Sequence, residues 1–181
     1  MTFSDPTRTS SSQGEAPAPR VLFVDQSGRL GGAELYLLDL VRARVGHSHV
    51  VLLEDGPFET ALREAQIPVT ILSGAEDLRQ VRKQDGLGAV LRAGPALYRA
   101  ARRLAMLARD YDLLFANTQK ALLIAGLAGW WAERPVVWNL HDLLTADHFT
   151  RLNRWGAVQA ANRFATHVIA NSRASQAATT W

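Results

Sequence analysis

Two glycines, Gly31 and Gly32, follow the short apolar run Val21–Val24 and precede residues with helical spacing. Glycine has no Cβ, so the backbone can approach a bulky anion there, and free N–H groups at a helix start point toward negative charge. A diphosphate requires this chemistry. A tight turn between a strand and a helix explains the same pair equally well. The loop matches neither G-x-G-x-x-G nor a P-loop.

Two acids flank this loop. Glu34 falls in the first turn of the expected helix, where the helix dipole favours an acid by about 0.3–1 kcal/mol. Glu34 is therefore either a dipole-stabilising acid or a ligand contact. Asp25, at the end of the apolar run, could bind a ribose or another hydroxyl, or it could cap the loop.

A second apolar run, Val136–Leu140, leads directly into His141 and Asp142. An imidazole at a strand end can donate to a sugar hydroxyl or help to bind a carbonyl or phosphate. Asp142 could orient the ring. A half-buried histidine bonded to the backbone is equally compatible with the pattern. The acid and histidine at 147–148 add no recognised metal spacing, so we expect no metal.

A polar cluster, Asn117-Thr118-Gln119, follows four apolar residues. Asn117 and Thr118 could bind hydroxyl groups, or they could cap the helix that follows. Asn171-Ser172 offers the same choice, and there the cap is favoured.

Strands are expected over residues 21–24, 49–53, 68–72, 113–116, 136–140 and 168–170. Helices are expected over 33–45, 58–65, 87–110, 121–132 and 151–165, with a new one starting near Arg173. This alternation predicts an α/β fold, a Rossmann-like three-layer sandwich with a mainly parallel six-stranded sheet. Right-handed crossovers favour the strand order 3-2-1-4-5-6. Residues 26–34 and 117–119 would then line the crevice between the first and fourth strands, with His141 beside it.

The 181 residues suit one domain, and the absence of cysteine excludes a disulfide framework. A net charge of +3 does not argue for nucleic acid as a partner. Residues 1–19 lack any apolar stretch and are expected to form a disordered tail with no secretory signal. The longest apolar run, Ala121–Ala132, falls short of the ~20 residues that span a bilayer. A cytoplasmic location is expected.

The long central helix carries a basic face, which consists of Arg92, Arg99, Arg102, Arg103 and Arg109. This face is either the solvated outer side of a helix that covers the sheet, or a peripheral contact with anionic lipid at the inner side of a membrane. We expect no exposed aromatic residue on this helix, and this favours the solvated side.

The segments Gly31–Glu34, Asn139–Asp142 and Val168–Ser172, in this order, resemble the N-terminal domain of family 4 retaining glycosyltransferases of the GT-B fold. The resemblance covers roughly residues 20–181. It implies two Rossmann-like domains that face each other across a cleft, with the acceptor held mostly by this one. The nucleotide-sugar would be held by the other domain, and neither a metal nor another cofactor would be needed.

The resemblance also implies roles for single residues. Gly31 and Gly32 would face the donor phosphates or the reacting sugar, His141 would contact the transferred sugar as the catalytic residue, and Asn117 and Thr118 would line the acceptor side. The family's Glu-x7-Glu donor signature belongs to a C-terminal domain, and no two glutamates here have that spacing. We therefore expect no transfer without a second domain or a partner subunit.

Two other functions fit the residues. The first is a non-catalytic interaction module that binds a partner through the open cleft face. The second is an S-adenosylmethionine-dependent methyltransferase, in which Glu54-Asp55 would supply the ribose-binding acid at the end of the second strand.

Overall fold

A computed structural model describes the backbone of residues 17–72, 87–141 and 151–170. Most of the expected N-terminal tail, Asp142 and the helix expected near Arg173 lie outside these residues. The six predicted strands are all present, and their bounds differ from the expected ones by at most one residue. They are β1 (Val21–Asp25), β2 (Ser48–Leu52), β3 (Val69–Ile71), β4 (Leu113–Ala116), β5 (Val136–Leu140) and β6 (His167–Ala170).

The strands form one sheet in the order β3-β2-β1-β4-β5-β6, as predicted. Every neighbouring pair is parallel. The chain therefore moves outward from β1 toward β3, returns, and continues from β4 on the other side. This reversal lies between β1 and β4, where ligands bind in open α/β sheets.

The helices of the described residues are α1 (Gly32–Arg42), α2 (Pro57–Glu64), α4 (Leu87–Ala108), α5 (Gln119–Ala132) and α6 (Arg151–Phe164). The prediction for α1 was too long, because the chain leaves the helix at Ala43 and reaches a left-handed Gly46 with φ of 87°. Pro95, expected at a start or kink, lies inside α4.

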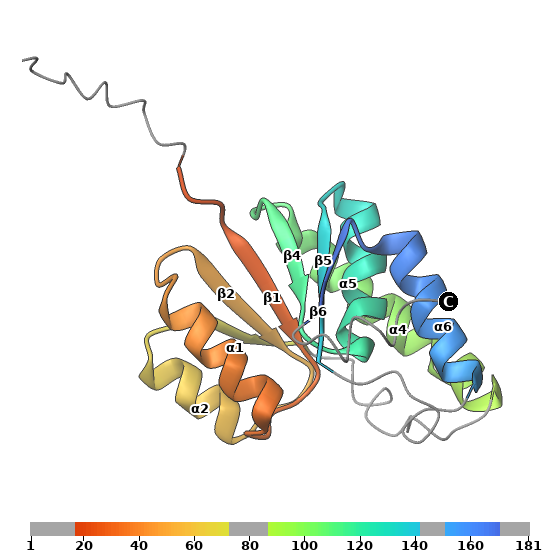
Figure 1. The fold of residues 1–181 in the computed structure, drawn as a ribbon, viewed down its shortest axis with the longest axis horizontal. Coiled ribbons are helices and arrows are strands. Elements are labelled where there is room, and N and C mark those ends of the chain that lie inside the picture. The colour runs from red at the N-terminus through yellow and green to blue at the C-terminus, as the bar shows by residue number, and fades with distance from the viewer. Residues whose placement is uncertain (1–16, 73–86, 142–150, 171–181) are drawn as a thin grey trace, which may run out of the picture.

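The helices cover both faces of the sheet, so the molecule has three layers (Figure 1). α1 and α2 lie on one face and share a core with residues of β1 and β2, among them Phe23 and Val50. α4, α5 and α6 lie on the other face, over Leu22 and Leu114. β1 and β4 are thus covered on both sides, which explains their nearly continuous apolar sequences.

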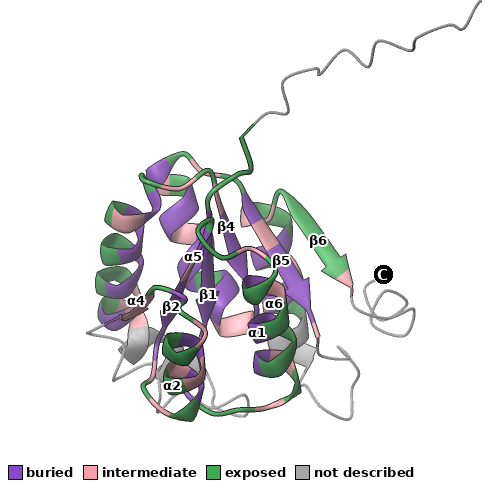
Figure 2. Cartoon of the chain, turned by 90° about the vertical axis from the view of Figure 1, so that its left-hand side faces the viewer, coloured by how far each residue is buried: buried purple, intermediate pink, exposed green. Residues whose placement is uncertain are grey.

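The sheet is not equally buried across its width. The strands at its centre are buried, whereas β6 at one edge is exposed along most of its length (Figure 2). Val168 and Ile169 of this strand are 46% and 45% exposed. Among the described helices, none has the length and apolar character that crossing a bilayer requires.

Candidate functional site

A pocket of about 170 Å³ lies at the carboxyl end of the central strands. Its walls come from the loop after β1, the start of α1, the start of α5 and the end of β5. The lining residues are Gln26, Ala33, Glu34, Asn117, Thr118, Gln119, Lys120, Trp138, Asn139, Leu140 and His141. The volume is below the ~300–1,000 Å³ of a site that encloses a whole drug-sized ligand. The pocket therefore has the size of one part of a larger cleft.

The loop after β1 is held in place by the loop between β2 and α2. A Cβ atom on Gly28 would lie 1.9 Å from the carbonyl oxygen of Asp55. The carbonyl oxygen of Gly28 accepts a 2.8 Å hydrogen bond from the N–H of Phe58, the second residue of α2. This contact fixes the path that brings the chain to Gly31.

Gly31 is the N-cap of α1, and its N–H donates to Oε2 of Glu34 over 3.0 Å. The first helical hydrogen bond runs from the N–H of Leu35 to the carbonyl oxygen of Gly31. The N–H groups of residues 32–34 therefore precede the helical ladder, as at every helix start. Glu34 is only 9% exposed and its side chain caps the helix start, which agrees with the first of its two expected roles. It also lines the pocket, so a ligand contact stays a prediction.

Gly32 is not required by the turn. A Cβ atom there would meet nothing within 4 Å, and its φ lies outside the left-handed range. At Gly31 a Cβ atom would meet only the carboxylate end of Glu34, at 2.7 Å. Neither packing nor backbone conformation therefore requires a glycine at position 32.

Asp25 ends β1 and is fully buried. Its Oδ1 accepts the N–H of Ser27 over 2.9 Å, and its Oδ2 accepts Nδ2 of Asn117 over 2.6 Å. Asp25 thus caps the loop and does not face a ligand. Burial raises the pKa of its carboxyl group from 3.8 to about 6, against the lowering effect of the bond from Asn117.

Asn117, directly after β4, connects Asp25 to His141. Its Nδ2 group donates to Asp25 and, over 3.2 Å, to the carbonyl oxygen of Ala33. Its Oδ1 lies 3.1 Å from Nδ2 of Asn139 and 3.1 Å from Nε2 of His141. Asn117 is 1% exposed. Its polar atoms are already engaged, so it supports the pocket wall from within.

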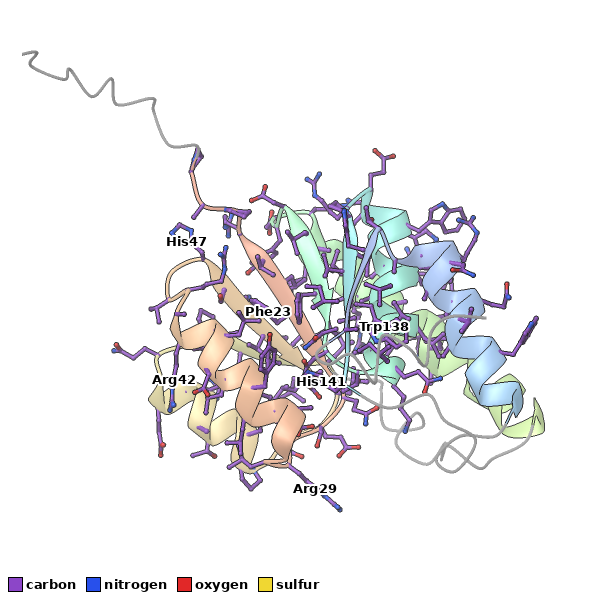
Figure 3. The ribbon with its side chains drawn as sticks, in the orientation of Figure 1. Phe23, Arg29, Arg42, His47, Trp138 and His141 are labelled. Atoms are coloured by element: carbon purple, nitrogen blue, oxygen red, sulfur yellow. The ribbon has the colours of Figure 1, made fainter. Side chains whose placement is uncertain are left out.

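His141, after β5, lies at the end of the sheet toward which the strand arrows point (Figure 3). Its Nε2 atom is 2.5 Å from Nδ2 of Asn139. Its ring also meets the ring of Tyr36 from α1 edge-on, with 5.2 Å between the centroids. The predicted meeting of the first loop and helix with His141 in one crevice is therefore confirmed. The pocket is lined by Gln26 of this loop and by Ala33 and Glu34 of α1. Gly31 and Gly32, which were expected in the lining, are not part of it.

The other predicted site residues have separate places. Thr118 lines the pocket, and its Oγ1 accepts the N–H of Ala121 over 3.2 Å, so it also caps α5. Asp142 lies outside the described residues. In the described ranges there is no group of three potential metal ligands.

Tyr36, Asn139 and Lys120 were not predicted as functional residues. Tyr36 lies one helical turn beyond Gly32 and Ala33, which was the available signal. Asn139 stands in β5, two residues before His141, and both residues line the pocket. Lys120 directly follows the polar cluster at 117–119, which was the available signal.

These features define a class of protein: an α/β domain with a pocket, lined mostly by residues with polar side chains, at the reversal point of a parallel sheet. The family model described as Glycosyltransferase Family 4 matches residues 30–180, and the chain belongs to this family. No curated protein sequence matches the chain.

Solved structures of Alr3699/HepE from Anabaena are similar to this chain. The complex with UDP-glucose is 40% identical with a TM-score of 0.75, and the match covers 90% of this chain and 40% of that one. The complex with UDP and glucose gives 40% identity and a TM-score of 0.73, with the same coverage. The chain thus spans about 40% of the length of the HepE chains that it matches.

A putative UDP-N-acetylglucosamine 2-epimerase from Listeria monocytogenes has a TM-score of 0.56 at 12% identity, over 90% of this chain and 42% of that one, and shows the fold alone. Family membership decides against the methyltransferase alternative. The site agrees, because Glu54 and Asp55 are not among the residues that line the pocket.

Proposed function

We propose that this chain is the acceptor-side domain of a retaining glycosyltransferase that takes its sugar from a nucleotide-diphosphate sugar. The observation that carries the proposal is the position of His141 beside the first turns of α1 in one pocket. The similar HepE structure is a complex with UDP-glucose, which supports a UDP-sugar as the donor.

The residues of the pocket suit a sugar diphosphate. The N–H groups of residues 32–34 would face the phosphates or the reacting sugar, where a helix start favours negative charge. His141 would hold a hydroxyl of the transferred sugar. Thr118, on the neighbouring strand end, would form the acceptor side, and Asn117 would support this wall from within. No metal or other cofactor enters this proposal.

Transfer would require a second domain, supplied by a longer chain or by a partner subunit. A developing diphosphate charge is stabilised by donors that are already in place around it. The described pocket provides such donors from one side only. We therefore expect this chain alone to be inactive.

The test is an assay of transfer from UDP-glucose by this chain alone and with the remaining part of HepE added in trans. The same samples are titrated with UDP-glucose, GDP-glucose and S-adenosylmethionine by isothermal titration calorimetry. The proposal predicts binding of UDP-glucose and turnover only in the mixture. Turnover by this chain alone would refute the need for a second domain. If the chain forms a defined complex with a partner and binds no sugar nucleotide, the non-catalytic interaction module would be favoured.

We also propose a cytoplasmic location with a peripheral membrane contact through α4. Arg99, Arg102 and Arg103 are exposed on this helix, and the side chain of Arg92 lies outside the described ones. The expectation that the helix has no exposed aromatic residue was wrong, because Tyr98 is 51% exposed beside Trp131. Exposed Met106 adds a further apolar group. Charge-reversed Arg99, Arg102 and Arg103 should abolish pelleting with anionic liposomes, and unaltered pelleting would contradict the contact.

A further inference from the structure

We propose that Asn117 and Asn139, anchored by Asp25, are positioning residues that hold His141 in the neutral tautomer with its proton on Nδ1. The three residues lie at the ends of three adjacent strands, β1, β4 and β5. Each is at most 1% exposed. Together with Glu34 they account for all but one of the buried polar or charged residues in the part of the chain that the structure describes.

The neighbours of Asn117 determine the orientation of its amide. One end of its amide lies 2.6 Å from Oδ2 of Asp25 and 3.2 Å from the carbonyl oxygen of Ala33. A backbone carbonyl only accepts hydrogen bonds, whatever the protonation state of the carboxyl group. This end must therefore be the NH₂ group, and the oxygen of Asn117 must face the other way.

The orientation of Asn117 in turn determines that of Asn139. The oxygen of Asn117 lies 3.1 Å from one end of the Asn139 amide, which must then be its NH₂ group. The opposite orientation would place two amide oxygens against each other and would bury the NH₂ group where it has no acceptor. The observed orientation leaves only Oδ1 of Asn139 without a partner. Buried N–H groups without acceptors are the rarer defect in proteins.

The orientation of Asn139 determines which nitrogen of the His141 ring carries the proton. The same NH₂ group of Asn139 lies 2.5 Å from Nε2 of His141. A donor that faces a ring nitrogen requires an unprotonated nitrogen, and a neutral imidazole then carries its proton on the other one. The oxygen of Asn117 is also 3.1 Å from Nε2. A proton on Nε2 could reach it only in direct competition with the N–H of Asn139.

The consequence for chemistry rests on the proposed function. A His141 ring with its proton on Nδ1 can donate a hydrogen bond to a sugar or phosphate oxygen only from that nitrogen. It cannot serve as a base through Nε2, which is already accepting. Asn139 and Asn117 would thus decide the role of His141 without taking part in the reaction themselves.

The experiment is a long-range ¹H–¹⁵N correlation spectrum of the whole chain with labelled histidine, without ligand, at about pH 8, where an ordinary histidine is neutral. The signals that vanish in His141→Gln identify the ring. We expect the shift of an unprotonated nitrogen for Nε2 and that of a protonated nitrogen for Nδ1. The reverse pattern, or an averaged one, would overturn the assignment.

Asn139→Asp tests the cause, because a carboxylate in place of the NH₂ group accepts a proton and should move it to Nε2. Asn162→Asp, at an exposed position of α6, is the matched control and should leave the His141 signals unchanged. Asn139→Ala provides a second arm if the buried carboxylate prevents folding, and it should raise the fraction protonated at Nε2. An unchanged spectrum in either folded Asn139 variant contradicts the inference. A failure to bind UDP-glucose with the expected tautomer present would contradict only the proposed function.

Discussion

Gly28 and Asp55 lie in contact through their backbones, so that a Cβ atom on the glycine would stand 1.9 Å from the carbonyl oxygen of Asp55. The contact is reciprocal, because a Cβ atom on Gly56, whose φ is 148°, would meet the carbonyl oxygen of Gly28 at 2.6 Å. The two loops after β1 and β2 therefore hold each other. This contact sets the position from which α1 starts.

Gly28→Ala should destabilise the domain. The added methyl group meets backbone atoms, which cannot rotate away, and such overpacking costs about 3 kcal/mol. Urea unfolding measures the free energy. Gly94→Ala is the control, since a Cβ atom on Gly94 meets nothing within 4 Å. A loss below about 0.5 kcal/mol for Gly28→Ala would contradict the contact.

Gly32→Ala should weaken the binding of UDP-glucose without lowering the stability of the domain. The methyl group has open space, so the free energy of unfolding should stay the same or rise by up to about 1 kcal/mol. Binding of UDP-glucose to the chain paired with a donor-binding domain should weaken about tenfold, as expected for the loss of one hydrogen bond to a charged group. Gly156→Ala, also in open space but in α6 and not at the start of α1, should leave binding unchanged. Equal affinities of the two variants would count against a ligand at Gly32.

Thr118→Ala should remove the N-cap of α5 and cost about 1 kcal/mol of stability. Thr118→Ser keeps an oxygen for the N–H of Ala121 and should recover most of the loss. Thermal unfolding of the three proteins provides the measurement. If Thr118→Ser is as unstable as Thr118→Ala, the capping bond does not account for the effect.

His49 should make the domain less stable as the pH falls from about 7 to 5. Burial lowers the pKa of this histidine below 6.5, so the unfolded chain binds a proton that the folded chain does not. Where the unfolded state holds more protons than the folded state, the stability decreases as the pH falls. In the folded chain the ring lies between the hydroxyl groups of Tyr111 and Thr70, at 2.6 Å and 2.9 Å.

His49→Gln keeps polar atoms in this place but has no titrating ring, so its stability should decline less over that pH range. Asp25 acts in the opposite direction, since its pKa of about 6 lets the folded chain hold a proton that the unfolded chain loses above about 4. Asp25, and Glu34 beside it, are present in both proteins. The difference between their urea unfolding curves therefore isolates His49. Parallel curves would contradict the prediction.

The order of the sheet could be predicted from the sequence because each buried strand is a short apolar run, and right-handed crossovers leave few arrangements. The end of α1 could not, because nothing between residues 42 and 46 is a strong helix breaker except Gly46 itself. The roles of single glycines were also out of reach. Gly28 and Gly32 look alike in the sequence, yet Gly28 lies against the backbone of a distant loop, whereas a Cβ atom on Gly32 would meet nothing within 4 Å.

The site was predictable in position and less so in detail. Strand ends at β1, β4 and β5 identified the loop after β1, Asn117 and His141 as neighbours. The buried chain of amides from Asp25 to His141 was not predicted, because it depends on side-chain directions across three strands. Asn139 in particular was assigned to a strand and to the segment Asn139–Asp142 but was given no role of its own, although it lines the same pocket as His141.

The proposed pocket is tested most sharply by an NMR titration of the ¹⁵N-labelled chain with UDP-glucose, in the presence of the unlabelled donor-binding part of HepE. Binding in this pocket predicts that the amide signals of residues 31–34 and of His141 shift together, with one dissociation constant. Gly156 and β6 should remain unaffected. If the mixture is saturated with UDP-glucose and the signals of residues 31–34 and His141 do not change, this pocket does not hold the sugar diphosphate.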